Sequence, residues 1–183
     1  DGFSTDGTYD MISYPKIQET KYRSRQMNAA AKYASGDYLF FLHCDSIIGS
    51  DCINLIENSN LDVGCFTINF TPTNQKLDFI EFFSNLRVKT KHIAFGDQGI
   101  FIKKDIFEKI GGYKNIALME DYQLSLDLKE AGYKIKQLDY PIYSSSRKFT
   151  NKEFKTGIMM KFLQKMYRNG YNVEKIAEIY KNI

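Results

Sequence analysis

The spacing of apolar residues alternates along the chain between the two periodicities of regular secondary structure. Helical spacing, good helix formers and terminal glycines predict helices over residues 24–35, 50–57, 77–88, 105–110 and 120–131. Apolar runs between them predict strands over 38–42, 63–70, 99–102 and 133–138. Helical periodicity returns in a final segment, 151–183.

This alternation indicates the fold class. Strand–helix–strand units with right-handed crossovers predict an α/β domain with a doubly wound, mainly parallel sheet. We expect residues 1–150 to form this domain, and 151–183 to form a helical extension packed on the domain or at an interface. Ligands of such sheets bind at the carboxyl ends of strands. Polar residues that directly follow the apolar runs are therefore the candidate site.

Composition narrows the class of protein. The 183 residues are 43% hydrophobic, which suits one folded domain and excludes intrinsic disorder. A net charge of +3 is too small to indicate a nucleic-acid-binding protein. No apolar run approaches the ~18 residues that a membrane span needs. The three cysteines show no zinc-site spacing and favour a reduced, cytoplasmic compartment.

Two polar clusters offer a ligand loop and a metal site. Residues 1–8, with Asp1 and Asp6, suit either a loop that approaches a ligand or a solvated turn. Asp45 follows the strand at 38–42, where a carboxylate can hold Mg²⁺ or Mn²⁺ against a diphosphate. His43 is a candidate second ligand, better suited to Mn²⁺. Alternatively, His43 is a buried histidine and Asp45 a helix cap.

Two further clusters precede predicted elements. Asp97 and Gln98 lie between two glycines, which suits either a close backbone approach to a substrate or a tight turn. Glu120 and Asp121 open the helix at 120–131, where they either complement the helix dipole or supply a general base.

Two basic groups are candidates for phosphate binding. Arg23 with Arg25, and Arg147 with Lys148, can bind phosphate oxygens or form exposed charged faces. The chain lacks both the Gly-rich phosphate loop and the dinucleotide-binding fingerprint. The order of the clusters along the chain is therefore more informative than any one of them.

Taken in order, these motifs resemble glycosyltransferase family 2. They are DGFSTDGT (1–8), RSRQMN (23–28), SGD (35–37), LHCD (42–45), GDQG (96–99), GGY (111–113), MED (119–121) and SSSRKF (144–149). The RSRQMN motif, and HCD where the family usually has D-x-D, are similar to the radical-SAM/selenodomain-associated branch.

The resemblance implies a GT-A fold and inverting transfer of a sugar from a nucleotide-sugar donor to an acceptor hydroxyl, with Mn²⁺ or Mg²⁺. It implies that Asp45 binds the metal with His43 beside it, that Asp121 is the base with Glu120 as its neighbour, and that Arg147 steadies the diphosphate. Donor or other substrate contacts are expected from Asp1, Asp6, Arg23, Arg25, Asn28, Asp97 and Gln98.

The sequence departs from the family pattern in three places. The strand, helix and strand that precede the first Asp-rich loop in the family are absent, Gly2 replaces a second Asp, and Lys148-Phe149 replaces Arg-Trp. Without those elements we expect the strand at 38–42 to have an open edge, and Val63 and Phe66 to lack a neighbouring strand. We therefore expect the chain either to have low stability or to pair with a partner chain that fills the gap. A non-catalytic nucleotide-binding relative, an inactive fragment and a nucleotidyltransferase stay open as alternatives.

The carboxyl-terminal segment carries an amphipathic stripe. In 154–167, apolar residues recur at helical spacing, while Lys161, Lys165 and Arg168 cluster on another side. Such a helix can lie on an anionic membrane at the inner face of the cell, near a lipid-linked acceptor. Alternatively, the stripe packs on the domain or on a second copy of the chain.

Overall fold

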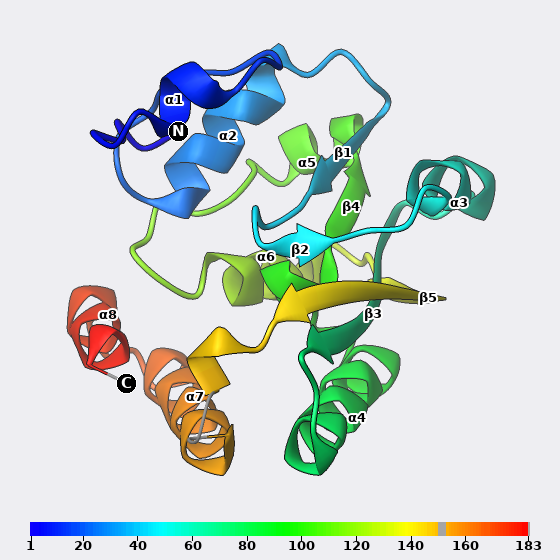
Figure 1. The fold of residues 1–183 in the computed structure, drawn as a ribbon. Coiled ribbons are helices and arrows are strands. Elements are labelled where there is room, and N and C mark those ends of the chain that lie inside the picture. Colours follow the sequence, from blue (N-terminus) through cyan, green and yellow to red (C-terminus); the bar gives the residue numbers. More distant parts are fainter. Residues whose placement is uncertain (150–152, 183) are drawn as a thin grey trace.

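The computed structural model describes residues 1–149 and 153–182, and it shows a curled five-stranded sheet with helices around it (Figure 1). The strands are β1 (Tyr38–Phe41), β2 (Ser46–Ile47), β3 (Val63–Thr71), β4 (Ile100–Lys103) and β5 (Lys136–Ser145). The helices are α1 (Thr8–Met11), α2 (Arg23–Tyr33), α3 (Cys52–Ser59), α4 (Gln75–Lys91), α5 (Lys104–Lys109), α6 (Glu120–Glu130), α7 (Glu153–Arg168) and α8 (Val173–Lys181). Two 3₁₀ turns, η1 (Gly96–Gln98) and η2 (Arg147–Phe149), complete the described elements.

The sheet is mixed, so the prediction of a mainly parallel sheet is wrong. The strand order is β1-β4-β3-β5-β2, and only the β3–β5 pairing is parallel among the described residues. β1, β3 and β5 do run in one direction, as the alternation indicates. However, β4 runs the opposite way and lies between β1 and β3. The α/β class is confirmed, but of the strands consecutive in the sequence, only β3 and β4 are neighbours in the described sheet.

Local side-chain chemistry explains why two elements differ from their predicted bounds. The helix predicted over 77–88 begins earlier because the Asn74 side chain accepts hydrogen bonds from the backbone N–H groups of Lys76 and Leu77. The strand predicted over 133–138 begins later and continues through Pro141. Pro141 lies where the β3–β5 register shifts, a place at which a missing N–H is tolerated.

The core covers both faces of β3. Val63 and Phe66 are buried: Val63 pairs with Ile102 of β4, and Phe66 pairs with Leu138 of β5. The expectation that these two residues would lose a neighbour is therefore wrong. β1 lies at the edge of the sheet, with no strand on its outer side in the described part of the chain.

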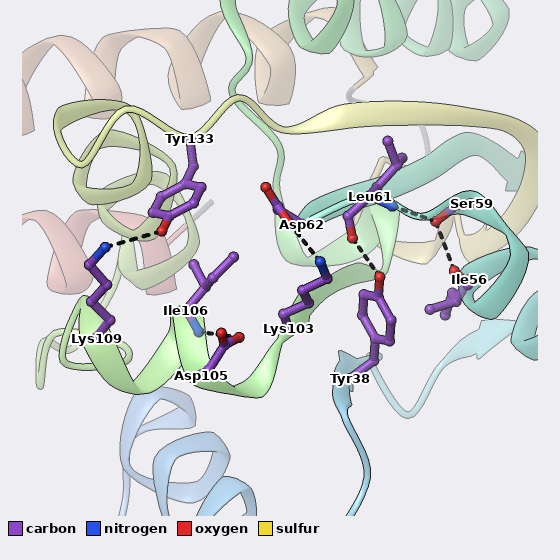
Figure 2. A network of polar contacts seen from close by, with 10 residues as sticks. All are labelled: Tyr38, Ile56, Ser59, Leu61, Asp62, Lys103, Asp105, Ile106, Lys109 and Tyr133. Atoms are coloured by element: carbon purple, nitrogen blue, oxygen red, sulfur yellow. Dashed lines mark hydrogen bonds and ion pairs between the residues drawn. The ribbon is translucent and has the colours of Figure 1, made fainter.

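Polar contacts close one end of the sheet (Figure 2). The Tyr38 hydroxyl, at the start of β1, donates to the Leu61 carbonyl at 2.7 Å. Lys103, at the end of β4, pairs with Asp62 before β3 at 2.8 Å. The other end, where β1 and β3 finish and β4 begins, carries the residues that the sequence marks as functional.

The carboxyl-terminal segment forms two helices. α7 and α8 are separated at Gly170, whose φ of 76° ends the first helix. Leu163 of α7 and Ile176 of α8 are buried with Met119 and Tyr122 of the domain, so part of the amphipathic stripe packs on the domain. The boundary expected at 150/151 lies outside the described residues. Within the described residues, no helix has the length and apolar character needed to cross a membrane.

Candidate active site

The candidate site lies where β1 ends, η1 leads into β4 and α6 begins. Two tight backbone turns create this junction. Gly99, with a φ of 60°, turns the chain from η1 into β4, and a Cβ there would lie 2.4 Å from Ile142 Cδ1. Met119, with a φ of 69°, precedes the first turn of α6 and its two acidic residues.

An arginine from α2 meets the acidic start of α6. Arg23 Nε lies 2.9 Å from Glu120 Oε1, and 3% of the Glu120 side chain is exposed. Arg23 Nη1 also lies 3.4 Å from His43 Nε2. Burial, together with the charge of Asp121, raises the pKa of Glu120, and Arg23 opposes that rise. Desolvation is the largest single influence and lowers the pKa of Arg23, but Glu120 and Asp121, together with Tyr180 and Asp97, raise the pKa overall.

Asp121 is the more accessible carboxylate of the acidic pair. Its Oδ2 accepts from the Gly96 N–H at 2.9 Å, and its Oδ1 accepts from the Tyr122 N–H at 2.7 Å. These bonds hold the carboxylate between η1 and α6. Asp121 is half-buried whereas Glu120 is buried, so Asp121 is the carboxylate of the pair that is open to solvent.

A second carboxylate and a second arginine, Asp97 and Arg87, influence each other's charge and that of the Asp121 region. Asp97 is partly exposed as a residue, but its Oδ1 is buried and has no hydrogen-bond partner in the structure. Burial raises the pKa of Asp97 to about 6, with Arg87 opposing and Asp121 adding to the rise. We define the charged cluster as Arg23, Arg87, Asp97, Glu120 and Asp121.

Sequence reasoning missed Arg87. Its Nη2 donates to Gln98 Oε1 at 2.9 Å, its Nε donates to the Ile93 carbonyl at 3.2 Å, and its guanidinium lies 4.0 Å from the Phe95 ring centroid. An arginine within the predominantly apolar helix predicted over 77–88 was the available signal. The Gln98 side chain is fully buried in this network, so it holds the η1 loop in place.

The two candidate metal ligands have different surroundings. His43 packs against Gly96, where an added Cβ would lie 2.5 Å from the histidine Nε2. Asp45 is partly exposed, and its Oδ2 lies 3.3 Å from Arg147 Nη2. Among the described residues, no three His, Cys, Asp or Glu side chains converge as a metal cage. The single carboxylate of Asp45 fits an ion that takes its other ligands from phosphate oxygens and water.

Two of the residues predicted to contact substrate, Asp1 and Asp6, instead form hydrogen bonds within their own turns. The Asp1 carboxylate accepts from the backbone and hydroxyl of Ser4, and the Asp6 carboxylate accepts from the backbone and hydroxyl of Thr8. The structure gives no contact between either carboxylate and the charged cluster.

Two further residues predicted to contact substrate, Arg25 and Asn28 of α2, instead form hydrogen bonds with the segment that precedes α6. Arg25 Nε donates to Asn115 Oδ1 at 2.7 Å. The Asn28 side chain accepts from the Tyr113 N–H at 2.9 Å and donates to the Tyr113 carbonyl at 2.8 Å. Asn28 therefore anchors α2 to residues that lead into the acidic pair.

Of the predicted site residues, the structure brings together Arg23, His43, Asp97, Glu120 and Asp121. Asp45 and Arg147 form a separate pair two residues beyond His43. Asp1, Asp6, Arg25 and Asn28 make their contacts elsewhere, and Gln98 lies inside the protein.

Comparisons with known proteins bear on the fold. The chain is similar to the mannosyltransferase PcManGT from Pyrobaculum calidifontis, solved in complex with GDP-Man and Mn²⁺, with a TM-score of 0.64 and 17% sequence identity. The likeness covers 92% of this chain and 53% of that protein, so the chain spans about half the length of its neighbour. No protein-family model matches the sequence, and no curated protein matches it. The chain thus has the fold of a glycosyltransferase.

Proposed function

We propose that the protein is an inverting glycosyltransferase of the family 2 type, which moves a sugar from a nucleotide-sugar donor to an acceptor hydroxyl. One observation carries the proposal: Glu120 and Asp121 open α6 beside Arg23, in a fold shared with a mannosyltransferase. A nucleotide sugar is the donor class because the neighbour was solved with GDP-Man. The GT-A strand arrangement is part of the same proposal.

Asp121 is the proposed general base. In a single displacement, a carboxylate oxygen of Asp121 takes the proton of the acceptor hydroxyl while the hydroxyl oxygen forms a bond to the anomeric carbon. The bond between the anomeric carbon and the diphosphate oxygen breaks, and its electron pair leaves with the nucleoside diphosphate. Glu120, held by Arg23 at 2.9 Å, keeps the start of α6 in position rather than meeting the acceptor.

The diphosphate is proposed to lie near Asp45 and Arg147. The Arg147 side chain is 71% exposed beside Asp45, so its guanidinium can turn toward phosphate oxygens. Asp45, with His43 nearby, would hold the divalent ion. When bound, Mn²⁺ or Mg²⁺ neutralises charge on the leaving diphosphate.

Transfer and binding assays on the whole chain test this proposal. GDP-mannose, UDP-glucose and UDP-N-acetylglucosamine are offered with methyl glycosides and a prenyl phosphate, with Mn²⁺ or with EDTA. Release of GDP or UDP that depends on both Mn²⁺ and an acceptor is the expected result. Calorimetry with GDP and UDP measures binding separately.

The Asp121→Asn variant tests the base. Turnover is expected to fall at least about 100-fold, as is typical when a general base is lost, with nucleotide affinity kept. Asp105→Asn is the matched control, because Asp105 also opens a helix and accepts from the next backbone N–H, at 2.8 Å. Figure 2 places Asp105 at the closed end of the sheet. Unchanged turnover in Asp121→Asn would contradict its role, and nucleotide binding without transfer would favour a non-catalytic relative.

A further inference from the structure

Helix α4 exposes a row of large apolar side chains. Phe79, Phe82, Phe83 and Leu86 are 53%, 60%, 43% and 38% exposed. Their spacing of three, four and seven residues places them on one side of the helix. The opposite side carries Leu77 and Val88, which are buried in the core. α4 is therefore apolar on the side that faces away from the sheet as well as on the side that packs on it.

Helix α7 extends this surface. α7 lies beside α4: a Cβ at Gly157 would lie 3.9 Å from Ile80 Cδ1, and Lys161 Nζ lies 6.0 Å from the Phe83 ring centroid. Ile158 and Phe162, one helical turn apart, are 69% and 53% exposed. We define the α4–α7 face as Phe79, Phe82, Phe83, Leu86, Ile158 and Phe162. Figure 1 shows the two helices at the same side of the molecule, away from α2.

The charges on α7 are almost all positive. Lys155, Lys161, Lys165 and Arg168 are exposed, whereas Glu153, the only acidic residue of this helix, is buried. Glu153 also accepts a hydrogen bond from Asn74 and pairs with Lys76 at 3.8 Å. Lys161 thus lies beside the exposed Phe83 ring, and this arrangement of a long apolar stem and an aromatic ring suits the boundary between lipid chains and headgroups.

We propose that the α4–α7 face docks on an anionic lipid surface. Six exposed large apolar side chains on two adjacent helices indicate an interaction surface. The lysines select a negatively charged partner, and each contributes through attraction to acidic lipids. A second copy of the chain on this face would bring two lysine-bearing α7 surfaces together, so the charge opposes a symmetric dimer. This inference stands on the surface alone and does not depend on the proposed function.

A tryptophan reporter gives a direct test, because the sequence contains no Trp. Phe82→Trp and Phe162→Trp each place a single fluorophore on the α4–α7 face. Tyr33→Trp is the matched control, since Tyr33 is an exposed aromatic residue on α2. With vesicles of phosphatidylcholine and phosphatidylglycerol, the emission of the first two is expected to shift to shorter wavelength, and that of the control to stay unchanged. No shift in either variant at low salt would refute the proposal.

Vesicle sedimentation then measures the contribution of each residue type. The double variant Phe82→Ser with Phe162→Ser is expected to lower the partition coefficient at least about tenfold, because both rings lose their contact with acyl chains. The double variant Lys161→Glu with Lys165→Glu is expected to lower the partition coefficient by more than about fivefold per residue. Fivefold is about the contribution of one lysine near an acidic membrane, and each new glutamate is also repelled. Lys32→Glu on α2 is the control for the change in charge.

Three results would overturn membrane docking. The first is equal sedimentation of wild type and the serine double variant. The second is equal binding to vesicles of pure phosphatidylcholine, which would remove the role of the lysines. The third is a concentration-dependent dimer that disperses in the serine double variant, which would assign the face to a second copy of the chain.

Discussion

Replacement of Asn28 by alanine is expected to lower the free energy of unfolding and to leave ligand affinity unchanged. The Asn28 amide makes two hydrogen bonds to the backbone of Tyr113, at 2.8 and 2.9 Å, and Tyr113 is 3% exposed. Each bond contributes about 1 kcal/mol, and each buried backbone group left without a partner adds about 1 kcal/mol or more. The free energy of unfolding should therefore fall by about 2–4 kcal/mol.

Urea denaturation followed by circular dichroism measures this change. A domain of this size has a urea dependence of about 2 kcal/mol per molar, so the midpoint should fall by about 1–2 M. Asn54→Ala, at an exposed position of α3, makes the same change in helix propensity without touching a buried group. Asn28→Asp keeps the acceptor for the Tyr113 N–H but turns a carboxylate toward the Tyr113 carbonyl, so it should also destabilise.

The opposite pattern would refute this reasoning. If Asn28→Ala keeps the wild-type midpoint and loses affinity for GDP and UDP, Asn28 acts on the nucleotide and not on the fold. Equal shifts in Asn28→Ala and Asn54→Ala would assign the loss to helix propensity alone.

Three further predictions concern the site. Burial raises the pKa of Asp97 to about 6 against the opposition of Arg87, so the contribution of Asp97 to stability is present below pH 4 and lost as the pH rises through 6. The free energy of unfolding of Asp97→Asn relative to wild type should therefore be up to about 3 kcal/mol higher at pH 7.5 than at pH 4, as measured by urea titration. The same difference between variant and wild type at both pH values would exclude this. Gly96→Ala should displace His43, because the new Cβ would lie 2.5 Å from Nε2. Calorimetry should then show that Mn²⁺-dependent binding of GDP or UDP is about tenfold weaker, whereas Gly36→Ala, at an exposed glycine, is the control and should bind as wild type does. Asp45→Asn should abolish the Mn²⁺-dependent part of nucleotide affinity and leave the affinity in EDTA unchanged; wild-type affinity with Mn²⁺ would exclude Asp45 as a ligand.

The motifs include five of the residues that gather at the site, Arg23, His43, Asp97, Glu120 and Asp121, but they do not reveal the separate environments of these residues. Glu120 and Asp121 are adjacent in sequence and equivalent in any local pattern. The structure separates them, because Arg23 from α2 covers Glu120 while Gly96 from η1 holds Asp121 at 2.9 Å. Arg87 could not be assigned to this group from sequence, since its partners Gln98 and Ile93 come close only when η1 folds back on α4.

Local interactions decided what could be predicted from the sequence by itself. The α/β class, the start of α6 at Glu120 and the direction shared by β1, β3 and β5 follow from residue spacing and helix-end chemistry, which act over a few residues. Strand order depends instead on contacts between distant segments. The insertion of β4 between β1 and β3, and the two-residue strand β2 at the outer side of β5, are decided by side-chain packing across the sheet and leave no periodic signal in so few residues. The same reasoning applies to α7, whose stripe is divided by tertiary packing into buried Leu163 and exposed Phe162, although both are equally apolar in the sequence.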